Sequence, residues 1–202
     1  MTPRLRGLYA ITPDSGDSAA LFAKVNAALE GGIAMLQYRR KRTAPDQQRV
    51  EAIELAKLCA RRGVPFIVND DVALAVEVAA DGVHVGREDP SVVECRKKLK
   101  GRLLGVSCYN DVAAAKKTVA AGADYVAFGS VFASPTKPGA VRAPLDLFGA
   151  KLGVPLCAIG GITLDNATAV VEAGADLLAV ISDLFDAPDI AARARQYAKL
   201  FT

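Results

Sequence analysis

The chain has 202 residues, of which 51% are hydrophobic and 23% charged, with a formal net charge of +3. This composition is typical of a globular domain and excludes a disordered chain. No apolar run approaches the roughly 20 residues of a membrane-spanning helix, and no long basic run favours nucleic acid. We therefore expect one domain over residues 1–202, with neither a membrane nor a nucleic acid as partner.

Eight short apolar runs recur along the chain and predict eight β-strands. In chain order they are Leu8–Thr12, Ile33–Gln37, Pro65–Val68, Gly82–Val85, Leu103–Ser107, Tyr125–Gly129, Pro155–Ile159 and Leu177–Ile181. Several are rich in valine and isoleucine and nearly continuous, as in strands buried on both faces of a parallel sheet. Segments with helical periodicity lie between them, such as Ala44–Arg62 and Leu164–Ala173.

The joints between these segments repeat as well. Residues 121–124 and 173–176 share the sequence Ala-Gly-Ala-Asp, each time where a helix should end and a strand begin. A glycine placed there can take the left-handed conformation that stops a helix. Eight strands over the chain give about 25 residues per strand–helix unit. The fold class expected is α/β, a single (β/α)₈ TIM barrel with its active site at the C-terminal ends of the strands. An open doubly wound sheet is the alternative, but no GxGxxG motif follows the first strand.

Cations and carboxylates follow the predicted second, third and fourth strands. Alternate residues of a strand share a face, so Gln37, Arg39 and Lys41 could converge on the barrel mouth, where they would suit a polyanion; a solvated strand end is the plain alternative. Asp70 and Asp89 follow the next two strands and form a candidate pair for Mg²⁺, although Asp89 could instead cap a helix. Asp71 is expected to cap the helix that follows it.

Small and hydroxyl residues follow the later strands. Ser107 ends the fifth strand, and residues 129–139 form a long segment rich in glycine, serine and proline with a single lysine, Lys137. Gly160 and Gly161 follow the seventh strand, where the lack of side chains would let backbone amides approach a phosphate, or would simply make a turn. Together these features predict two anion sites in one mouth, as an enzyme joining two phosphorylated substrates would need.

Five segments in this order resemble thiamine phosphate synthases: residues 37–41 (Gln-Tyr-Arg-Arg-Lys), Asn69-Asp70, residues 84–89 (His-Val-Gly-Arg-Glu-Asp), residues 134–137 (Ser-Pro-Thr-Lys) and residues 160–162 (Gly-Gly-Ile). The resemblance covers about residues 8–182. It implies a Mg²⁺-dependent transferase of thiamine biosynthesis. Such an enzyme joins 4-amino-2-methyl-5-(diphosphomethyl)pyrimidine to 4-methyl-5-(2-phosphoethyl)thiazole, giving thiamine monophosphate and diphosphate by a dissociative substitution.

The resemblance also implies roles for individual residues. Catalytic roles fall to Arg39, Lys41, Ser107 and Lys137, and one Mg²⁺ per subunit to Asp70 and Asp89. Substrate binding is expected of Gln37, Tyr38, Arg39, Arg40, Lys41, Asn69, Ser107, Ser134, Pro135, Thr136, Lys137, Gly161, Ile181 and Ser182. Mn²⁺ could replace Mg²⁺, since both accept oxygen ligands.

Other expectations remain open at this point. His84 is expected to hydrogen-bond within the mouth rather than to act as an acid or base, and Tyr9 could line the pyrimidine pocket or only pack in the core. The four cysteines show no metal spacing, so buried reduced thiols and a cytoplasmic location are expected, and the family is compatible with a homodimer.

The competing functions are three. The first is a thiazole tautomerase-like relative without synthase activity, the second a phosphosugar isomerase or epimerase, and the third a non-catalytic binding protein. The retained cations and carboxylates argue for the synthase.

Overall fold

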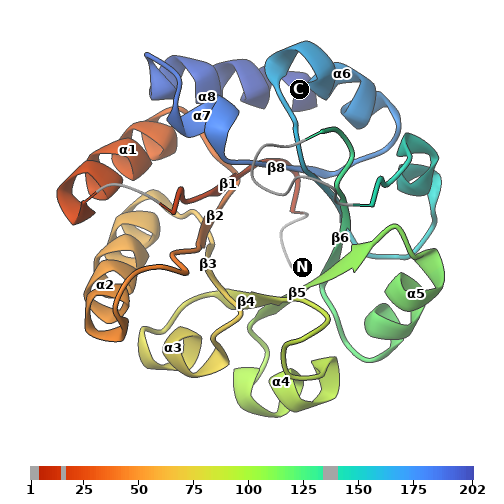
Figure 1. The fold of residues 1–202 in the computed structure, drawn as a ribbon, viewed down its shortest axis with the longest axis horizontal. Helices are drawn as coiled ribbons and strands as arrows, with labels where there is room; N and C mark the ends of the chain where they lie inside the picture. The colour runs from red at the N-terminus through yellow and green to blue at the C-terminus, as the bar shows by residue number, and fades with distance from the viewer. Residues whose placement is uncertain (1–4, 15–16, 134–140) are drawn as a thin grey trace.

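Eight parallel strands form a closed barrel in the computed structural model, which describes residues 5–14, 17–133 and 141–202 (Figure 1). Each strand pairs with the next in chain order, and β8 pairs with β1 to close the ring. The strands are β1 (Gly7–Ile11), β2 (Met35–Tyr38), β3 (Phe66–Asn69), β4 (Gly82–Val85), β5 (Leu103–Tyr109), β6 (Tyr125–Gly129), β7 (Leu156–Ile159) and β8 (Leu177–Val180). The (β/α)₈ prediction is confirmed, and the alternative of an open sheet is wrong because β1 and β8 are hydrogen-bonded neighbours.

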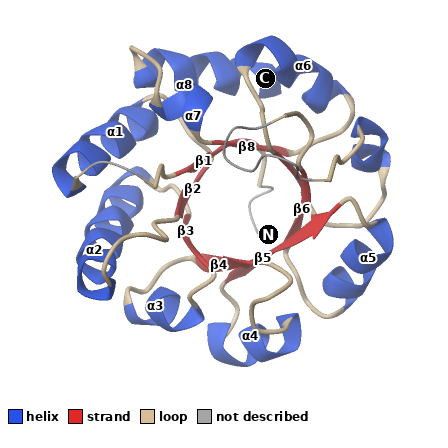
Figure 2. Cartoon of the chain, in the orientation of Figure 1, coloured by secondary structure: helices blue, strands red, loops and turns tan. Residues whose placement is uncertain are grey.

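Helices surround the barrel on its outer face (Figure 2). They are α1 (Ser18–Glu30), α2 (Pro45–Arg62), α3 (Val72–Glu77), α4 (Val92–Leu99), α5 (Val112–Ala120), α6 (Leu164–Glu172), α7 (Ser182–Phe185) and α8 (Ile190–Ala198), with 3₁₀ turns η1 (Leu145–Gly149) and η2 (Lys199–Phe201). Several of these helices have an N-cap residue whose side-chain oxygen accepts a hydrogen bond from a backbone amide of the first turn. The predicted cap Asp71, for example, accepts a hydrogen bond from the Leu74 amide at 2.9 Å. No helix in the described part of the chain is long and apolar enough to cross a membrane.

The strands are buried on both faces, which explains their nearly continuous apolar sequences. Outward side chains such as Leu8, Leu36 and Val83 pack under the helices, while a smaller cluster that includes Met35 and Tyr125 fills the barrel interior. The four cysteines are free and buried, as expected. Hydrophobic burial on both sides of every strand therefore holds the barrel closed.

The repeated Ala-Gly-Ala-Asp joints have a shared geometry. Gly122 and Gly174 both have φ near 111°, which confirms the predicted helix stop. The aspartate of each joint then makes two hydrogen bonds to the first residues of the preceding strand. Asp124 accepts from the Leu104 amide at 2.7 Å and donates its own amide to the Leu104 carbonyl at 2.8 Å.

Two more joints repeat this arrangement. Asp176 forms the same reciprocal pair with Leu156, and Asp81 forms it with Phe66. These three aspartates lie at the amino ends of the strands, opposite the mouth. They fix the register between neighbouring strands there.

Candidate active site

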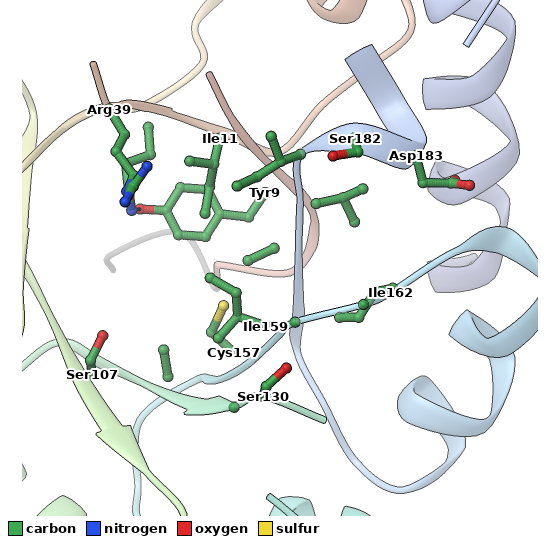
Figure 3. Close-up of a pocket in the computed structure, with 18 of the residues that line it drawn as sticks. Tyr9, Ile11, Arg39, Ser107, Ser130, Cys157, Ile159, Ile162, Ser182 and Asp183 are labelled. Atoms are coloured by element: carbon green, nitrogen blue, oxygen red, sulfur yellow. Dashed lines mark hydrogen bonds between the residues drawn. The ribbon is translucent and has the colours of Figure 1, made fainter. Parts of the chain in front are cut away.

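A cavity of about 1170 Å³ opens at the carboxyl ends of the strands. All eight strands contribute residues to its wall, as expected for a barrel of this kind. Figure 3 shows Arg39, Ser107 and Ser182 around this space, on parts of the chain that are far apart in sequence. Many of the predicted site residues therefore surround one cavity, while Lys41 and Asp70 line a smaller pocket.

Of the three alternate residues predicted to converge on the mouth, the first two line the cavity. Gln37 and Arg39 both line the cavity, and the backbone of Arg39 is held by Thr12, whose Oγ1 accepts from the Arg39 amide at 2.8 Å. Lys41 continues the row at the edge of the mouth, where its Nζ lies 2.9 Å from Asp70 Oδ2. Two cations thus lie at the same side of the opening.

The two intervening residues, Tyr38 and Arg40, were expected to bind substrate; both line a small pocket at the edge of the mouth, while their polar ends bond Glu51. Tyr38 Oη donates to Glu51 Oε2 at 2.7 Å, and Arg40 Nη2 lies 3.3 Å from Glu51 Oε1. Glu51 belongs to α2 and is fully buried. Odd and even residues of a strand point to opposite faces, so the polar ends of these two side chains reach toward α2. Their expected role in substrate binding stays a prediction.

Asp70 and Asp89 lie on adjacent loops and face one another. Burial raises the pKa of Asp89, the Gly86 amide opposes that shift at 2.6 Å, and the Asp70 carboxyl beside it raises the pKa further. Asp89 does not cap α4, because Ser91 does so with Glu94 in a reciprocal capping box. A smaller pocket of about 280 Å³ beside Asp70 is lined by all of residues 38–41 and by Asn69 and Asp70.

His84 and the tyrosines form a buried hydrogen-bonded row across the cavity floor. Tyr9 Oη lies 2.8 Å from Tyr125 Oη, which lies 3.1 Å from His84 Nδ1. His84 Nε2 lies 2.9 Å from Ser107 Oγ, and Gln37 Nε2 donates to Tyr9 Oη at 2.6 Å. Tyr9 is buried in the core and also borders the cavity, and its contact with a pyrimidine stays a prediction.

The Ser107–His84 contact is not a nucleophile–base pair of the hydrolase type. Burial lowers the pKa of His84 to about 4, so the ring is a weak base at neutral pH. Its second nitrogen faces the Tyr125 hydroxyl rather than a carboxylate that would stabilise an imidazolium. This arrangement agrees with the hydrogen-bonding role expected for His84.

The glycines after β7 are needed for close packing of the loop. Gly160 has φ of 104°, and a Cβ there would lie 2.1 Å from Ser130 Oγ; at Gly161 it would lie 2.2 Å from the Ala133 carbonyl oxygen. The Gly160 carbonyl also accepts from the Phe132 amide at 2.9 Å. The two glycines therefore let the loop after β7 lie against the segment after β6.

Gly160→Ala is expected to destabilise the protein more than Gly101→Ala does. Gly101 has a similar positive φ of 86°, but a Cβ added there would have no atom within 4 Å. Gly101→Ala therefore measures the cost of backbone strain without a steric clash. We expect about 1 kcal/mol for that strain alone, and about 1–3 kcal/mol more at Gly160 for the clash with Ser130. Urea unfolding of both variants measures the difference; equal losses would contradict the packing role.

The far end of the cavity contains a charged group that the sequence did not predict. Ser182 begins α7, and the neighbouring Asp183 accepts from Arg193 Nη1 and from Tyr197 Oη, each at 2.7 Å. Asp183 and Arg193 line the cavity together with Ile181 and Ser182. Figure 3 shows Asp183 next to Ser182. This pairing connects α7 to α8 behind the predicted phosphate end.

Tyr125 is a second residue that the sequence analysis did not assign to the site. It reaches the site through its hydrogen bond to His84. Alternation along the predicted strand 125–129 places Tyr125 on the same face as Gly129 at the mouth, which is the signal that could have found it. Ser134, Pro135, Thr136 and Lys137 lie outside the described residues. The remaining predicted residues, Asn69, Gly161, Ile181 and Ser182, all border the cavity.

The fold and site together define a (β/α)₈-barrel enzyme whose mouth suits anionic small molecules. Residues 8–184 match the family described as thiamine monophosphate synthase. The thiamine-phosphate synthase of Aromatoleum aromaticum is 58% identical over 98% of this chain and 97% of its own length, and that of Azoarcus sp. is 57% identical over the whole of both chains. The solved structure of thiamine phosphate pyrophosphorylase from Pyrococcus furiosus is 30% identical, with a TM-score of 0.86 over 98% of this chain and 96% of that one.

The chain therefore belongs to the thiamine monophosphate synthase family. The shared name of the relatives is that of a transferase, and this chain is an enzyme of that class. A solved 3-hexulose-6-phosphate synthase, 19% identical with a TM-score of 0.75, shares the fold alone.

Proposed function

We propose that this enzyme joins 4-amino-2-methyl-5-(diphosphomethyl)pyrimidine to 4-methyl-5-(2-phosphoethyl)thiazole, releasing thiamine monophosphate and diphosphate. The observation that carries the proposal is the single cavity with two different ends. Arg39 lies at one end and also lines a small pocket with Lys41, where a diphosphate would bind; Gly161 and Ser182 lie at the other end, where a phosphate would bind. Both substrates would then meet over the buried floor.

The two carboxylates are the proposed holders of one Mg²⁺ per subunit. Asp70 and Asp89 face each other beside Lys41, and such an oxygen donor set suits a hard divalent cation. The described residues contain no group of three or more histidine, cysteine, aspartate or glutamate side chains that could hold a metal. Water and substrate oxygens would therefore complete the coordination, which is usual for Mg²⁺ and open to Mn²⁺ as well. Bound there, the ion would offset negative charge on the departing diphosphate.

The residues of this chain would act mainly by positioning and charge stabilisation. The bond between the pyrimidine methylene carbon and the diphosphate oxygen breaks, its electron pair leaves with the diphosphate, and the thiazole nitrogen lone pair forms the new carbon–nitrogen bond. Arg39, Lys41 and Lys137 would stabilise the leaving anion, with Ser107 as a hydroxyl donor. Gln37 and Asn69 would orient the pyrimidine, and no enzyme nucleophile is needed.

The thiazole phosphate is proposed to bind at the opposite end. Ser134, Pro135, Thr136, Gly161, Ile181 and Ser182 would form that site. The loop after β7 is supported by Asn166, whose Nδ2 donates to the Gly161 carbonyl at 3.0 Å. A fixed loop holds the acceptor in place at little entropic cost.

Diphosphate release from the purified protein tests the function. With both substrates and Mg²⁺, we expect diphosphate and thiamine monophosphate in equal amounts, the latter followed by chromatography, and no product after EDTA treatment. Restoring Mg²⁺ should restore turnover. If folded, metal-replete protein makes no product, the tautomerase-like alternative is favoured, and isomerisation of the thiazole precursor is the next assay.

Two further properties remain proposals. We place the enzyme in the cytoplasm, because its four free, buried cysteines suit a reducing compartment. We also propose a homodimer, which light scattering of the purified protein would test.

A further inference from the structure

Buried hydrogen bonds link Gln37, Tyr9, Tyr125, His84 and Ser107 in one row. The positions of the protons decide in which direction the groups of this row donate. Burial raises the pKa of Tyr9 and of Tyr125 well above the usual value, so both phenols keep their protons. Each hydroxyl then has one proton to donate. The described residues give Tyr9 Oη two partners, Gln37 Nε2 and Tyr125 Oη.

The direction follows from the orientation of the Gln37 amide, whose Nε2 faces Tyr9 Oη. In this orientation Tyr9 Oη accepts from Gln37 and gives its own proton to Tyr125 Oη. Tyr125 must then pass its proton to His84 Nδ1, which has to be the unprotonated nitrogen of the ring. A neutral imidazole carries its proton on the other nitrogen, so His84 Nε2 donates to Ser107 Oγ.

This order leaves the Ser107 proton without a partner inside the row. Ser107 lines the cavity, and Figure 3 shows its hydroxyl directed into that space. If the hydrogen bonds ran in the opposite direction, Ser107 would donate its proton to His84 Nε2. Its hydroxyl would then present only lone pairs to an anion, which it could not bind. The direction of the row therefore decides whether Ser107 can bind an anionic oxygen.

We propose that Tyr125 is a positioning residue that holds His84 in the Nε2–H form and so keeps the Ser107 hydroxyl free to donate to the diphosphate. The identity of that anion rests on the proposed function, whereas the direction of the row does not. Tyr125 is fully buried and its ring fills the space beside Gly105, where a Cβ would lie 2.0 Å from the ring. A glycine at this point of β5 therefore lets the tyrosine reach across to His84.

The chain has a single histidine, which makes the tautomer directly measurable. Nitrogen NMR of protein labelled with ¹⁵N-histidine should show a protonated Nε2 and an unprotonated, hydrogen-bonded Nδ1 at neutral pH. In Tyr125→Phe, the Nδ1 signal should move toward that of a nitrogen without a hydrogen bond. Tyr38→Phe removes another buried tyrosine hydroxyl, one that bonds Glu51 outside the barrel, and should leave the His84 signals in place.

Binding of inorganic diphosphate with Mg²⁺, measured by calorimetry, tests the consequence at Ser107. We expect Tyr125→Phe and Ser107→Ala each to weaken binding about tenfold, the loss typical of one hydrogen bond to a charged group. Because Tyr125 would act through Ser107, the double variant should bind no more weakly than Ser107→Ala alone.

Three results would overturn the proposal. They are an Nδ1–H tautomer in the unmodified protein, an unchanged His84 spectrum in Tyr125→Phe, and additive losses in the double variant. None of these measurements needs turnover. If the spectra and binding agree but no thiamine monophosphate forms, the proposed function fails while the role of Tyr125 stands.

Discussion

Replacing Asp70 with asparagine is expected to lower kcat/KM for the pyrimidine diphosphate by about three orders of magnitude, because a metal contributes several kcal/mol of charge stabilisation to a reaction of this kind. Asparagine is the appropriate replacement, since Asp70 has a φ of 63° and asparagine tolerates that left-handed conformation. The variant keeps the side-chain shape and removes only the charge. Steady-state kinetics over a range of Mg²⁺ concentrations measures the loss.

The matched control is Asp111→Asn, which removes the same charge from the cap of α5. Asp111 accepts from the Ala114 amide at 2.9 Å, and asparagine caps helices nearly as well as aspartate. This control should keep both kcat and the Mg²⁺ response of the unmodified enzyme. If Asp70→Asn retains most of its activity, or if the two variants lose activity equally, the metal role proposed for Asp70 is wrong.

The second large effect is expected at Glu51, a fully buried carboxylate of α2. Glu51→Ala should lower the free energy of unfolding by about 3–5 kcal/mol, because it breaks the buried ion pair between Glu51 and Arg40. The same carboxylate also accepts from Tyr38 and from Ser18, so α1, β2 and α2 all lose a contact. Urea unfolding at neutral pH measures this loss.

A double replacement separates the lost charge pair from the lost volume. Glu51→Leu combined with Arg40→Met removes both charges and keeps apolar bulk, so it should be considerably more stable than Glu51→Ala. A loss below about 1 kcal/mol in Glu51→Ala would contradict the prediction, since that is the value of an exposed ion pair.

The fold could be predicted because its information is local. Each strand is an apolar run buried on both faces, and the Ala-Gly-Ala-Asp joints at residues 121–124 and 173–176 mark where helices stop. Most predicted strand ends are within one or two residues of those observed. The main difference is β5, which continues past Ser107 to Tyr109, where its pairing with β6 becomes irregular.

The site was predictable where it depends on strand alternation. Gln37 and Arg39 line the cavity for that reason, whereas the ion pair of Arg40 with Glu51 could not be predicted. The role of Arg40 depends on Glu51, eleven positions later on another element, and no local pattern shows that contact. Asp183 and Arg193 were missed for the same reason, since their pairing joins two helices across the far end of the cavity.

The reciprocal bonds of Asp81, Asp124 and Asp176 have a consequence for how this enzyme can change over evolutionary time. They secure the strands at the end of the barrel that no substrate reaches, so the frame needs no help from the catalytic loops to stay aligned. Loops at the mouth can then be lengthened, shortened or replaced while the scaffold beneath them keeps its shape. Sequence change that alters function can therefore concentrate at the carboxyl ends of the strands, while the amino ends keep the barrel stable.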